Sequence, residues 1–321
     1  MSLERLDLSS PVARLGFGLA AVGRPGYINL HRERDLVERT VEALRERTYE
    51  LLDAAYAAGV RYADAARSYG LAEEFLAGWL STRDVPDMVV GSKWGYTYTG
   101  DWRVDAEVHE TKDHGLAVYE RQLAETRELL GERLDLYQIH SLTVESPALA
   151  DTALHRRLAD LAATGVTVGF SSSGPRQADA IDAALRIEVD GMPLFRSVQA
   201  TWNVLEPSAG RALAAARAAG CHVIVKEAMA NGRLAEPSPE LGALAEVAAE
   251  VGAPQDAVAL AAVLHQPWAQ VVLSGAATTA QLATNLVAAR LELSDDQLAR
   301  LSTPAEPAEQ YWKHRATLPW Q

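Results

Sequence analysis

The stretch VRYADAARSYG, from Val60 to Gly70, begins like a buried strand and ends with polar side chains. Tyr62 is a residue that suits a pleated, half-buried surface. Asp64 then stands where the apolar run should end, and Tyr69 follows five residues later. Taken alone, the aspartate is best interpreted as the cap of a following helix and the tyrosine as a packing residue. The rest of the chain decides between this interpretation and a functional one.

Seven other short apolar runs occur along the chain, and long segments rich in Ala, Leu, Glu and Arg separate them. In the segment YELLDAAYAAG, the residues Leu52, Ala55, Tyr56 and Gly59 share one helical face. Strands that alternate with helices of this kind indicate βαβ units with parallel pairing. The eight runs are ARLGFGLA (Ala13–Ala20), VRYAD (Val60–Asp64), MVVGSK (Met88–Lys93), LDLYQIH (Leu134–His140), VTVGFSS (Val166–Ser172), SVQATWN (Ser197–Asn203), HVIVKE (His222–Glu227) and VVLSG (Val271–Gly275).

Eight such units predict an α/β fold, a single (β/α)8 TIM barrel, with its chemistry at the carboxyl ends of the strands. An open doubly wound sheet is the competing architecture, and it would normally carry a glycine-rich phosphate turn after its first strand. The first run instead gives GFGLAAVG, which does not match G-x-G-x-x-G. We therefore expect one barrel domain over residues 1–321. Two long loops, at about 94–112 and 231–240, and a tail at 302–321 are candidate lids or pocket walls.

The composition is typical of a globular protein, because 48% of the residues are hydrophobic and 23% are charged. A formal charge of -13 repels phosphate backbones and anionic lipids, so no nucleic-acid or membrane partner is expected. The single cysteine, Cys221, excludes an intramolecular disulfide and is expected to be a buried, inert thiol. The first twenty residues lack the apolar core of a signal peptide, and polar residues interrupt the apolar region 257–277. These features predict a soluble, cytoplasmic protein and leave its oligomeric state open.

Polar residues end three consecutive predicted strands. Asp64 ends the second, Lys93 the third and His140 the fourth, and Tyr69 lies one turn past the aspartate. In a barrel these side chains would converge near the axis. A buried lysine and aspartate make sense as a pair, because either alone would carry a heavy desolvation penalty. The sequence therefore predicts one cluster of four residues rather than four unrelated caps and packing groups.

These residues closely resemble those of the aldo-keto reductase family. That family carries an Asp and a Tyr in a motif similar to D-T-A-x-x-Y-G, here ADAARSYG, and a Lys at the end of its third strand, here VVGSKWG. It also carries a His in a run similar to D-L-Y-Q-I-H, here LDLYQIHS. The resemblance extends from about Leu15 to about Leu298. It implies an NAD(P)-dependent oxidoreductase that interconverts a carbonyl compound, an aldehyde or ketone, and an alcohol.

The resemblance also implies a role for each of the four residues. Tyr69 would donate or accept the proton, Lys93 would lower the pKa of its phenol, and Asp64 would hold the lysine charged and oriented. His140 would donate a hydrogen bond to the carbonyl oxygen of the substrate. The hydride itself belongs to a nicotinamide cofactor.

Further residues are assigned to this cofactor by resemblance. The family's G-x-S-N strand end corresponds to GFSS, so Ser171 matches the serine and Ser172 replaces the asparagine. Gln199 matches the family glutamine that contacts the nicotinamide amide. Turn chemistry before Gly174 is the alternative interpretation of the two serines.

The seventh predicted strand departs from the family pattern. Many members end it in an aromatic–serine pair, whereas this chain has Lys226 and Glu227. We interpret this pair as a self-neutralising plug or a cofactor contact, with Lys226 on the pyrophosphate. A contact of Glu227 with a polar substrate is the alternative, and Trp202 is a candidate substitute for the missing ring. Gly232 and Gly275, which follow the last two strands, complete the expected cofactor contacts.

The last motif resembles P-G-A-x-x-x-x-Q-L-x-x-N and reads LSGAATTAQLATN. Gln281 and Asn285 match the adenine-side positions, and a helix from about Thr279 offers an N-terminus that favours anions. NADP-using members often place Arg or Lys between the glycine and the asparagine, and this chain has neither from Val271 to Ala289. The resemblance predicts NADP(H). NAD(H) is the alternative, because the basic partner of a 2'-phosphate is absent.

Aromatic residues are expected to line the substrate pocket. Tyr27 and the residues Trp94, Tyr96 and Trp102 of the long loop suggest a pocket for an apolar or sugar-like substrate. The partner implied is a small carbonyl or alcohol compound.

Other chemistries are less well supported. His109 and His114 lie five residues apart, but a solvated acidic loop explains them better than a ligand set, so no metal is expected. A non-catalytic NADP(H)-binding regulatory barrel is an alternative that the intact set of four residues disfavours. A lyase or aldolase that uses Lys93 as a Schiff base is the weaker alternative.

Overall fold

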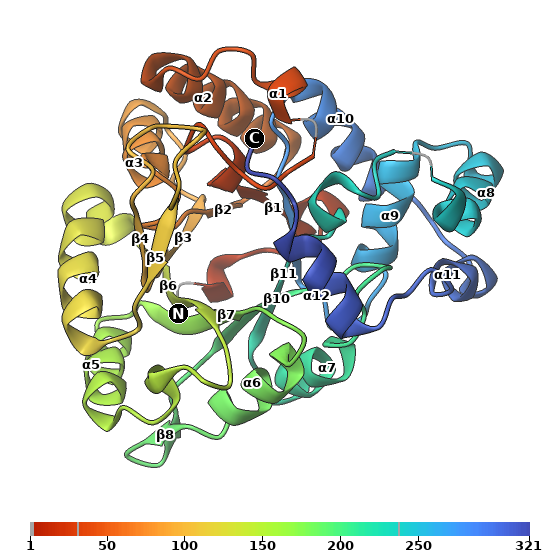
Figure 1. Ribbon diagram of the computed structural model, residues 1–321. Coiled ribbons are helices and arrows are strands. Elements are labelled where there is room, and N and C mark those ends of the chain that lie inside the picture. The colour runs from red at the N-terminus through yellow and green to blue at the C-terminus, as the bar shows by residue number, and fades with distance from the viewer. Residues whose placement is uncertain (1–2, 31, 237) are drawn as a thin grey trace.

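The computed structural model describes residues 3–30, 32–236 and 238–321. Eight parallel strands close into a barrel in the order β1-β12-β11-β10-β7-β6-β3-β2 (Figure 1). Each predicted run overlaps one of these strands, so the (β/α)8 fold is confirmed. The barrel strands are β1 (Leu15–Gly18), β2 (Tyr62–Asp64), β3 (Val89–Trp94), β6 (Leu136–Leu142), β7 (Thr167–Ser172), β10 (Ser197–Thr201), β11 (His222–Lys226) and β12 (Val271–Ser274).

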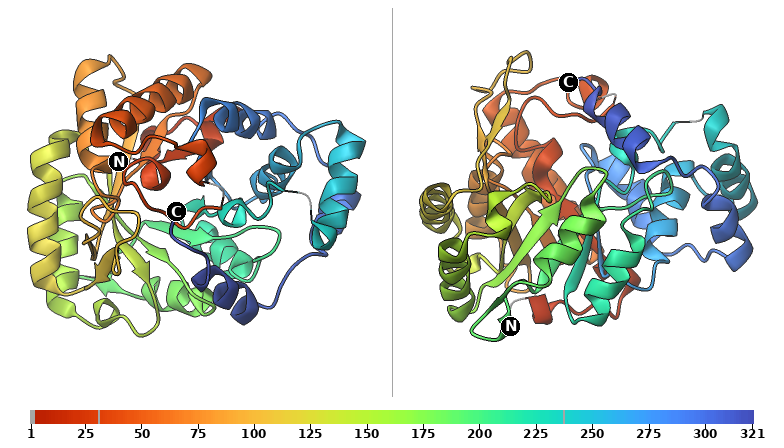
Figure 2. Two further views of the ribbon diagram at one scale, coloured as in Figure 1. Left: turned by 45° about the horizontal axis from the view of Figure 1, so that its top comes forward. Right: turned by 60° about the horizontal axis from the view of Figure 1, so that its bottom comes forward.

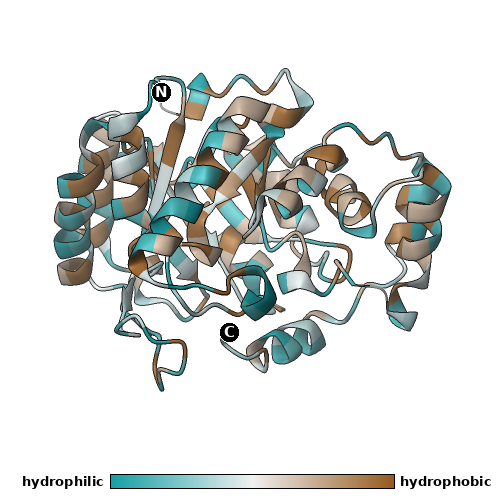
Figure 3. Cartoon of the chain, turned by 90° about the horizontal axis from the view of Figure 1, so that it is seen from above, coloured by the Kyte–Doolittle hydropathy of each residue, from teal (hydrophilic) through white to brown (hydrophobic). Residues whose placement is uncertain are grey.

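The helices form an outer layer that packs apolar residues against the barrel (Figures 1 and 3). In α2, Leu51, Leu52 and Ala55 are fully buried, Thr40 caps the first turn, and Gly59 ends the helix with φ 108°. Parallel strands are buried on both faces and need such a layer. The α-helices are α1 (Arg32–Asp35), α2 (Val41–Ala58), α3 (Ala72–Thr82), α4 (Leu116–Leu130), α5 (Thr152–Ala163), α6 (Gln177–Ala184), α7 (Gly210–Ala218), α8 (Gly242–Val251), α9 (Gln255–Leu264), α10 (Thr279–Ala288), α11 (Asp295–Leu301) and α12 (Ala308–Ala316).

Short 3-10 helices connect several of these elements. Two of them, η6 and η7, lie in the predicted loop 231–240, of which residue 237 is outside the described part of the chain. The 3-10 helices are η1 (Leu3–Arg5), η2 (Pro11–Arg14), η3 (Leu19–Ala21), η4 (Gly131–Arg133), η5 (Pro147–Leu149), η6 (Ala230–Gly232) and η7 (Pro239–Leu241).

The two ends of the barrel are closed by opposite ends of the chain (Figures 2 and 3). At the amino ends of the strands, Leu3 is buried in a cluster with Tyr62 and Val89. At the carboxyl ends, the last described residue, Gln321, exchanges two backbone hydrogen bonds of 3.0 and 2.9 Å with Tyr27. The C-terminal segment therefore lies over the end of the barrel at which the sequence predicts the site.

The long loop after β3 contains regular structure that the sequence did not predict. Strands β4 (Tyr96–Tyr98) and β5 (Glu110–Lys112) pair antiparallel within it. Gly95 makes the turn into this hairpin with φ 103°, a conformation that favours glycine. A second small antiparallel pair, β8 (Glu188–Val189) and β9 (Met192–Pro193), lies between α6 and β10.

Arg32 fastens the loop after β1 to the C-terminal segment. Its side chain is 1% exposed, and its guanidinium donates to the carbonyl oxygens of Ala21, Pro25, Arg24 and Gln321. Burying a guanidinium requires such a set of acceptors. The loop and the tail are thus held as one wall.

Two other predictions from the sequence concern the single cysteine and membrane-spanning helices. Cys221 is a free, buried thiol, as expected. Within the described residues, no single helix is long and apolar enough to cross a membrane, and one pair bent by 95°, Pro239–Val251 and Gln255–Leu264, passes by length and composition only. In that pair, residues 257–264 are all buried in the fold.

Gly23 is needed because of its lack of a side chain. A Cβ at this position would lie 2.4 Å from the carbonyl oxygen of Tyr69 and 2.5 Å from Cβ of Ala72. We expect Gly23→Ala to lower the free energy of unfolding by about 1–3 kcal/mol, because backbone must move. Gly242→Ala is the control: its Cβ would meet nothing within 4 Å, and it should be neutral or stabilising by up to about 1 kcal/mol. Urea denaturation measures both, and equal midpoints for the two variants would contradict the expectation.

Candidate active site

The side chain of Lys93 is the centre of the predicted cluster. It has no exposed surface, and its Nζ donates to Asp64 Oδ2, to the carbonyl oxygen of Ala65 at 2.9 Å and to the Tyr69 hydroxyl at 3.5 Å. Neighbouring parallel strands β2 and β3 bring the lysine and the aspartate together. The structure thus brings together three of the four predicted residues around one buried amine.

The Asp64 carboxylate is satisfied on both oxygens. Oδ1 accepts from Gln199 Nε2 and from the Tyr62 hydroxyl, each at 3.0 Å, while Oδ2 faces Lys93. The aspartate is 2% exposed. A buried carboxylate with an ammonium and two neutral donors meets the requirements for a stable buried ion pair.

His140 stands on the other side of the phenol. The rings of Tyr69 and His140 are edge-to-face, with centroids 5.4 Å apart. The Ser68 hydroxyl lies 3.4 Å from Nδ1 of the histidine, and either group can be the donor. The next residue, Ser141, has φ 55° and marks an irregularity in β6, which runs on to Leu142. His140 therefore lies within its strand rather than at the strand's last position.

Burial sets the protonation of both rings. It raises the pKa of Tyr69 well above 10, Asp64 acts in the same direction, and Arg24 lowers it. Burial lowers the pKa of His140 well below 6.5, and the charges of Lys93, Lys226 and Arg24 lower it further. Burial thus outweighs the nearby positive charge of Arg24 in setting the pKa of the phenol. The lowering of this pKa by Lys93 stays a prediction. At neutral pH, Tyr69 carries its proton and His140 is uncharged.

A cavity of about 430 Å³ opens at this end of the barrel. It extends from the Tyr69 phenol to the start of α10, and it includes residues from the loop after β1 and from the C-terminal segment. Lys93 lies behind its wall, fully buried. The predicted site residues that line the cavity are Asp64, Tyr69, His140, Gln199, Lys226, Gly232, Gly275, Gln281, Asn285 and Tyr27.

The carboxamide of Gln199 has one free acceptor in the described part of the chain. Its Nε2 is bound to Asp64, whereas its Oε1 is buried and has no hydrogen-bond partner. Since buried acceptors are rarely left unpaired, this oxygen fits the amide donor of a nicotinamide. The cavity is thus suited to the cofactor that the sequence predicts.

The two serines of β7 do not line the cavity. Both are fully buried; Ser171 Oγ accepts from the Ser141 amide at 2.8 Å, and Ser172 Oγ lies 3.5 Å from Gln177 Oε1. Their hydroxyls are engaged within the protein. Their predicted cofactor contacts therefore have no support in this geometry, and Ser171 instead fixes the backbone just after His140.

Lys226 and Glu227 form a larger ionic group than the expected plug. Lys226 Nζ donates to Thr201 Oγ1 at 2.8 Å and lies 3.4 Å from Glu227, while Arg315 of α12 binds both Glu227 oxygens at 2.7 and 2.6 Å. Burial raises the pKa of Glu227, but Arg315 and Lys226 outweigh it and bring that pKa to about 2. The pair thus also fastens the C-terminal segment to the barrel.

Three tryptophans do not occupy the positions predicted for them. Trp94 is fully buried against Tyr119 of α4, with ring centroids 5.0 Å apart, so it is not a pocket residue. Trp102 donates from Nε1 to the Arg39 carbonyl at 2.8 Å, away from the cavity lining. Trp202 packs edge-to-face on Trp268, so it cannot replace a stacking ring. In strands, successive side chains point to opposite faces; since Lys93 points inward, Trp94 must point out.

Tyr96 lies near the site without lining the cavity. Its ring is tilted against His140, with centroids 5.0 Å apart. Tyr27 does line the cavity and packs edge-to-face on Trp320 of the C-terminal segment. Of the four predicted substrate-pocket residues, only Tyr27 therefore faces the open space.

Sequence reasoning missed Arg24, which lines the cavity beside the phenol. Its guanidinium is 2% exposed, donates to Ser68 O and Glu110 Oε2 at 2.8 Å each, and lies 5.4 Å from the Tyr69 ring centroid and 4.8 Å from that of Trp320. Its Nε is buried and has no partner among the described residues. No spacing in the sequence signals this position, because its contacts come from distant loops.

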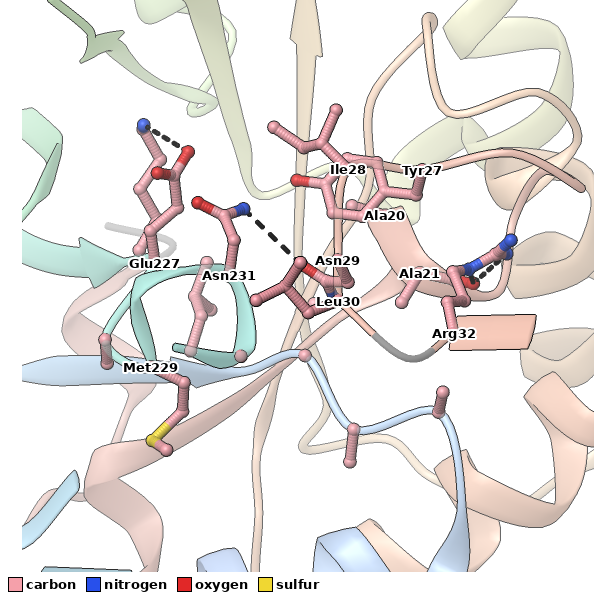
Figure 4. Close-up of a pocket in the computed structure, with 18 of the residues that line it drawn as sticks. Ala20, Ala21, Tyr27, Ile28, Asn29, Leu30, Arg32, Glu227, Met229 and Asn231 are labelled. Carbon is pink, nitrogen blue, oxygen red and sulfur yellow. Dashed lines mark hydrogen bonds and ion pairs between the residues drawn. The ribbon is translucent and has the colours of Figure 1, made fainter. Parts of the chain in front are cut away.

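A second missed feature joins two loops across the cavity. Asn231, with φ 57°, faces Asn29, and their side chains are 3.4 Å apart (Figure 4). The Leu30 amide donates to the Asn231 carbonyl at 3.0 Å. The loops after β1 and β11 are thus linked over the middle of the cavity.

The histidines of the long loop are buried rather than solvated. His109 stacks on Trp320 with ring centroids 4.0 Å apart. His114 lies 2.6 Å from Ser146 Oγ through Nδ1, and its Nε2 donates to the His140 carbonyl at 2.8 Å. Within the described residues, no group of three His, Cys, Asp or Glu side chains is arranged to hold a metal ion.

The fold and the strand-end cluster define a (β/α)8 barrel protein with a polar site at the carboxyl ends of its strands. A model of the Aldo/keto reductase family matches residues 14–303, and the chain belongs to this family. The family resemblance is thereby confirmed. The protein is accordingly an NAD(P)H-dependent oxidoreductase.

Individual relatives agree with this assignment. The chain is 26% identical to a D-threo-aldose 1-dehydrogenase from Pseudomonas sp, over 91% of this chain and 93% of that protein. The fold is similar to that of aldo-keto reductase AKR11C1 from Bacillus halodurans in its holo form, with TM-score 0.68, 20% identity and coverage of 92% and 93%. It is similar to that of glycerol dehydrogenase AKR11B4 from Gluconobacter oxydans, with TM-score 0.68, 20% identity and coverage of 91% and 90%.

His114 should make stability depend on pH. Burial lowers its pKa to about 4, so below pH 6.5 the unfolded chain binds a proton that the folded protein does not. The free energy of unfolding should therefore fall between pH 6.5 and pH 4, by up to roughly 3 kcal/mol from this residue. His114→Gln should flatten that fall. Exposed His314→Gln is the control and should keep it; identical pH profiles of urea midpoints for both variants would contradict the prediction.

Proposed function

We propose that the protein interconverts an aldehyde or ketone and the corresponding alcohol, with Tyr69 as the proton donor and acceptor. The observation that carries this proposal is the contact of the buried Lys93 amine with both Asp64 and the Tyr69 hydroxyl, at 3.5 Å from the latter. A bound nicotinamide dinucleotide supplies or accepts the hydride. Every other part of the reaction falls to side chains of this chain.

In the direction of reduction, Tyr69 donates its proton to the substrate oxygen. Its raised pKa keeps the phenol protonated until negative charge develops on that oxygen. Once the proton leaves, the phenolate is stabilised by the Lys93 side chain, which faces it and has no exposed surface of its own. Uncharged His140 donates from Nε2 to the same oxygen and orients it. In oxidation the proton takes the opposite path.

The cofactor would be held along the cavity. Gln199 Oε1 would accept from the nicotinamide amide, and Lys226 would face the pyrophosphate from the end of β11. Asn285 and Gln281 would lie at the adenosine end, where they line the cavity. Family resemblance alone favours NADP(H), and the contacts around α10 bear on the choice between the two dinucleotides.

The alternative of a Schiff-base lyase is disfavoured by the surroundings of Lys93. Its amine has no exposed surface and already donates to a carboxylate, a carbonyl oxygen and a hydroxyl. A nucleophilic lysine must be reachable and uncharged, and this environment stabilises the ammonium.

The first test is Tyr69→Phe, which removes only the hydroxyl. We expect kcat to fall by roughly 10²–10⁴-fold, because general acid–base catalysis typically contributes that much, while the Kd for dinucleotide changes little. The control is Tyr56→Phe, whose hydroxyl contacts Asp87 on the outer surface. Stopped assays on a panel of aldehydes, together with calorimetric binding of the dinucleotide, measure both quantities. Turnover by Tyr69→Phe at the wild-type rate refutes the proposed role.

A hydroxylated substrate fits the cavity wall near the phenol. Two ion pairs, Arg24–Glu110 and Arg315–Glu227, line the cavity there, and Arg24 Nε has no partner among the described residues. Such groups bind hydroxyls well and are poorly served by an alkyl chain. The similar protein from Pseudomonas sp is named an aldose dehydrogenase. We therefore extend the proposal to sugar-like substrates.

Arg24→Met tests this extension. We expect the ratio of kcat/KM for an aldose to kcat/KM for an aliphatic aldehyde of equal carbon number to fall by about tenfold, because the hydroxyl partner is lost. The aliphatic aldehyde serves as the internal control for effects on Tyr69. An unchanged ratio, in protein whose thermal unfolding shows it to be folded, contradicts the sugar-like class.

A further inference from the structure

The adenosine end of the cavity carries carboxylates where a phosphate would require cations. The described lining residues around α10 include two uncharged amide side chains, Gln281 and Asn285, and one arginine that points to solvent, Arg34. The acidic residues that line the same end are Asp35, Glu236 and Asp256. The specificity inferred from these residues rests on the proposed binding of a nicotinamide dinucleotide in this cavity.

The first turn of α10 is already occupied by its own side chains. Thr278 Oγ1 accepts from the Gln281 amide at 3.2 Å, and Gln281 Oε1 accepts from the Ala277 amide at 2.8 Å. Free amides at a helix N-terminus are what make it a phosphate site. Here a 2'-phosphate would have to displace these side chains to reach the Ala277 and Gln281 amides.

Asp35 is fixed at the same place. Its Oδ2 accepts from Gln281 Nε2 at 2.7 Å, so the carboxylate is held directly beside the capped turn. A fixed negative charge there repels a phosphate dianion. The same carboxylate is a good acceptor for the two hydroxyls of an unphosphorylated ribose, the role that an acidic residue plays in dinucleotide-binding folds that select NAD.

The arginines near Asp35 already bind other groups of the protein. Arg32 donates to carbonyl oxygens of the loop and the C-terminal segment, including Ala21 at 3.0 Å and Gln321 at 3.0 Å. Arg34 is paired with Glu236 at 3.0 Å, and its side chain is 60% exposed. From residue 271 to residue 289 the chain contains no Lys or Arg at all. The described residues thus offer a 2'-phosphate no ready partner.

From this arrangement we infer that the protein selects NAD(H) over NADP(H), with Asp35 as the residue that reads the ribose. The prediction of NADP(H) from family resemblance is thereby replaced by one from this chain's own contacts. Gln281 acts as a positioning residue, because it holds the carboxylate and closes the helix turn in one step.

Binding measurements test the inference without relying on turnover. Calorimetric Kd values for NAD⁺ and NADP⁺ should differ by at least about tenfold in favour of NAD⁺ for the wild-type protein, since charge repulsion of this kind readily exceeds one factor of ten. Asp35→Asn should reduce that ratio by about tenfold. The double variant Asp35→Ser/Gln281→Arg should bind NADP⁺ more tightly than NAD⁺, because it provides a cation and removes the carboxylate. Glu38→Gln removes an exposed carboxylate outside the cavity lining and should leave the ratio unchanged.

The outcomes separate this inference from the proposed function. Wild-type protein that binds NADP⁺ as tightly as NAD⁺, or an Asp35→Asn variant with an unchanged ratio, overturns the selection by Asp35 while leaving the oxidoreductase assignment intact. Folding of each variant is checked by circular dichroism, and if Asp35→Asn fails to fold, the wild-type ratio and the double variant decide. Protein that binds neither dinucleotide overturns the proposed function, and this inference with it.

Discussion

A single buried ion pair organises the candidate site. Lys93 and Asp64 are both inside the barrel, where an unpaired charge would be strongly destabilising. Keeping them there requires the Ala65 carbonyl and the donors Gln199 and Tyr62, so residues from several strands must be in register. Tyr69 is the neighbour of the amine that brings a hydroxyl to the cavity, which Asp64 also lines. The charge that stabilises a phenolate is thus built into the core rather than brought in by a mobile loop.

Local sequence patterns were sufficient to predict the barrel and the residues of this cluster. The alternation of apolar runs and helical segments predicted the eight strands, since each run had to be buried on both faces. Asp64, Lys93 and His140 were found because they are polar residues at or near the ends of such runs. Their convergence follows from barrel closure, which brings the ends of neighbouring parallel strands together. The catalytic roles of these residues are still a prediction.

The wrong predictions of site residues have two causes: the direction in which a side chain points, and contacts between residues far apart in the sequence. Trp94 was expected in the substrate pocket, yet the two-residue period of a strand turns it away from the cavity. Trp202 was expected to replace the stacking ring, but it packs on Trp268 instead. Ser171 was expected to bind cofactor, but its hydroxyl holds the Ser141 amide across to the next strand. Arg24 meets its partners through loops separated by more than forty residues, which no short motif encodes.

The two ends of the cavity differ in charge, and the difference bears on specificity. Toward the phenol lie the cations Lys93 and Lys226, and Arg315 anchors the C-terminal segment through Glu227. At the far end, Gln281 joins the helix cap to Asp35. The Gln281 side chain is uncharged and already binds the Ala277 amide and the Asp35 carboxylate, so it provides no cation for a phosphate. Residue 281 can therefore either stabilise the start of α10 or bind a 2'-phosphate, and in this chain its side chain stabilises the start of the helix.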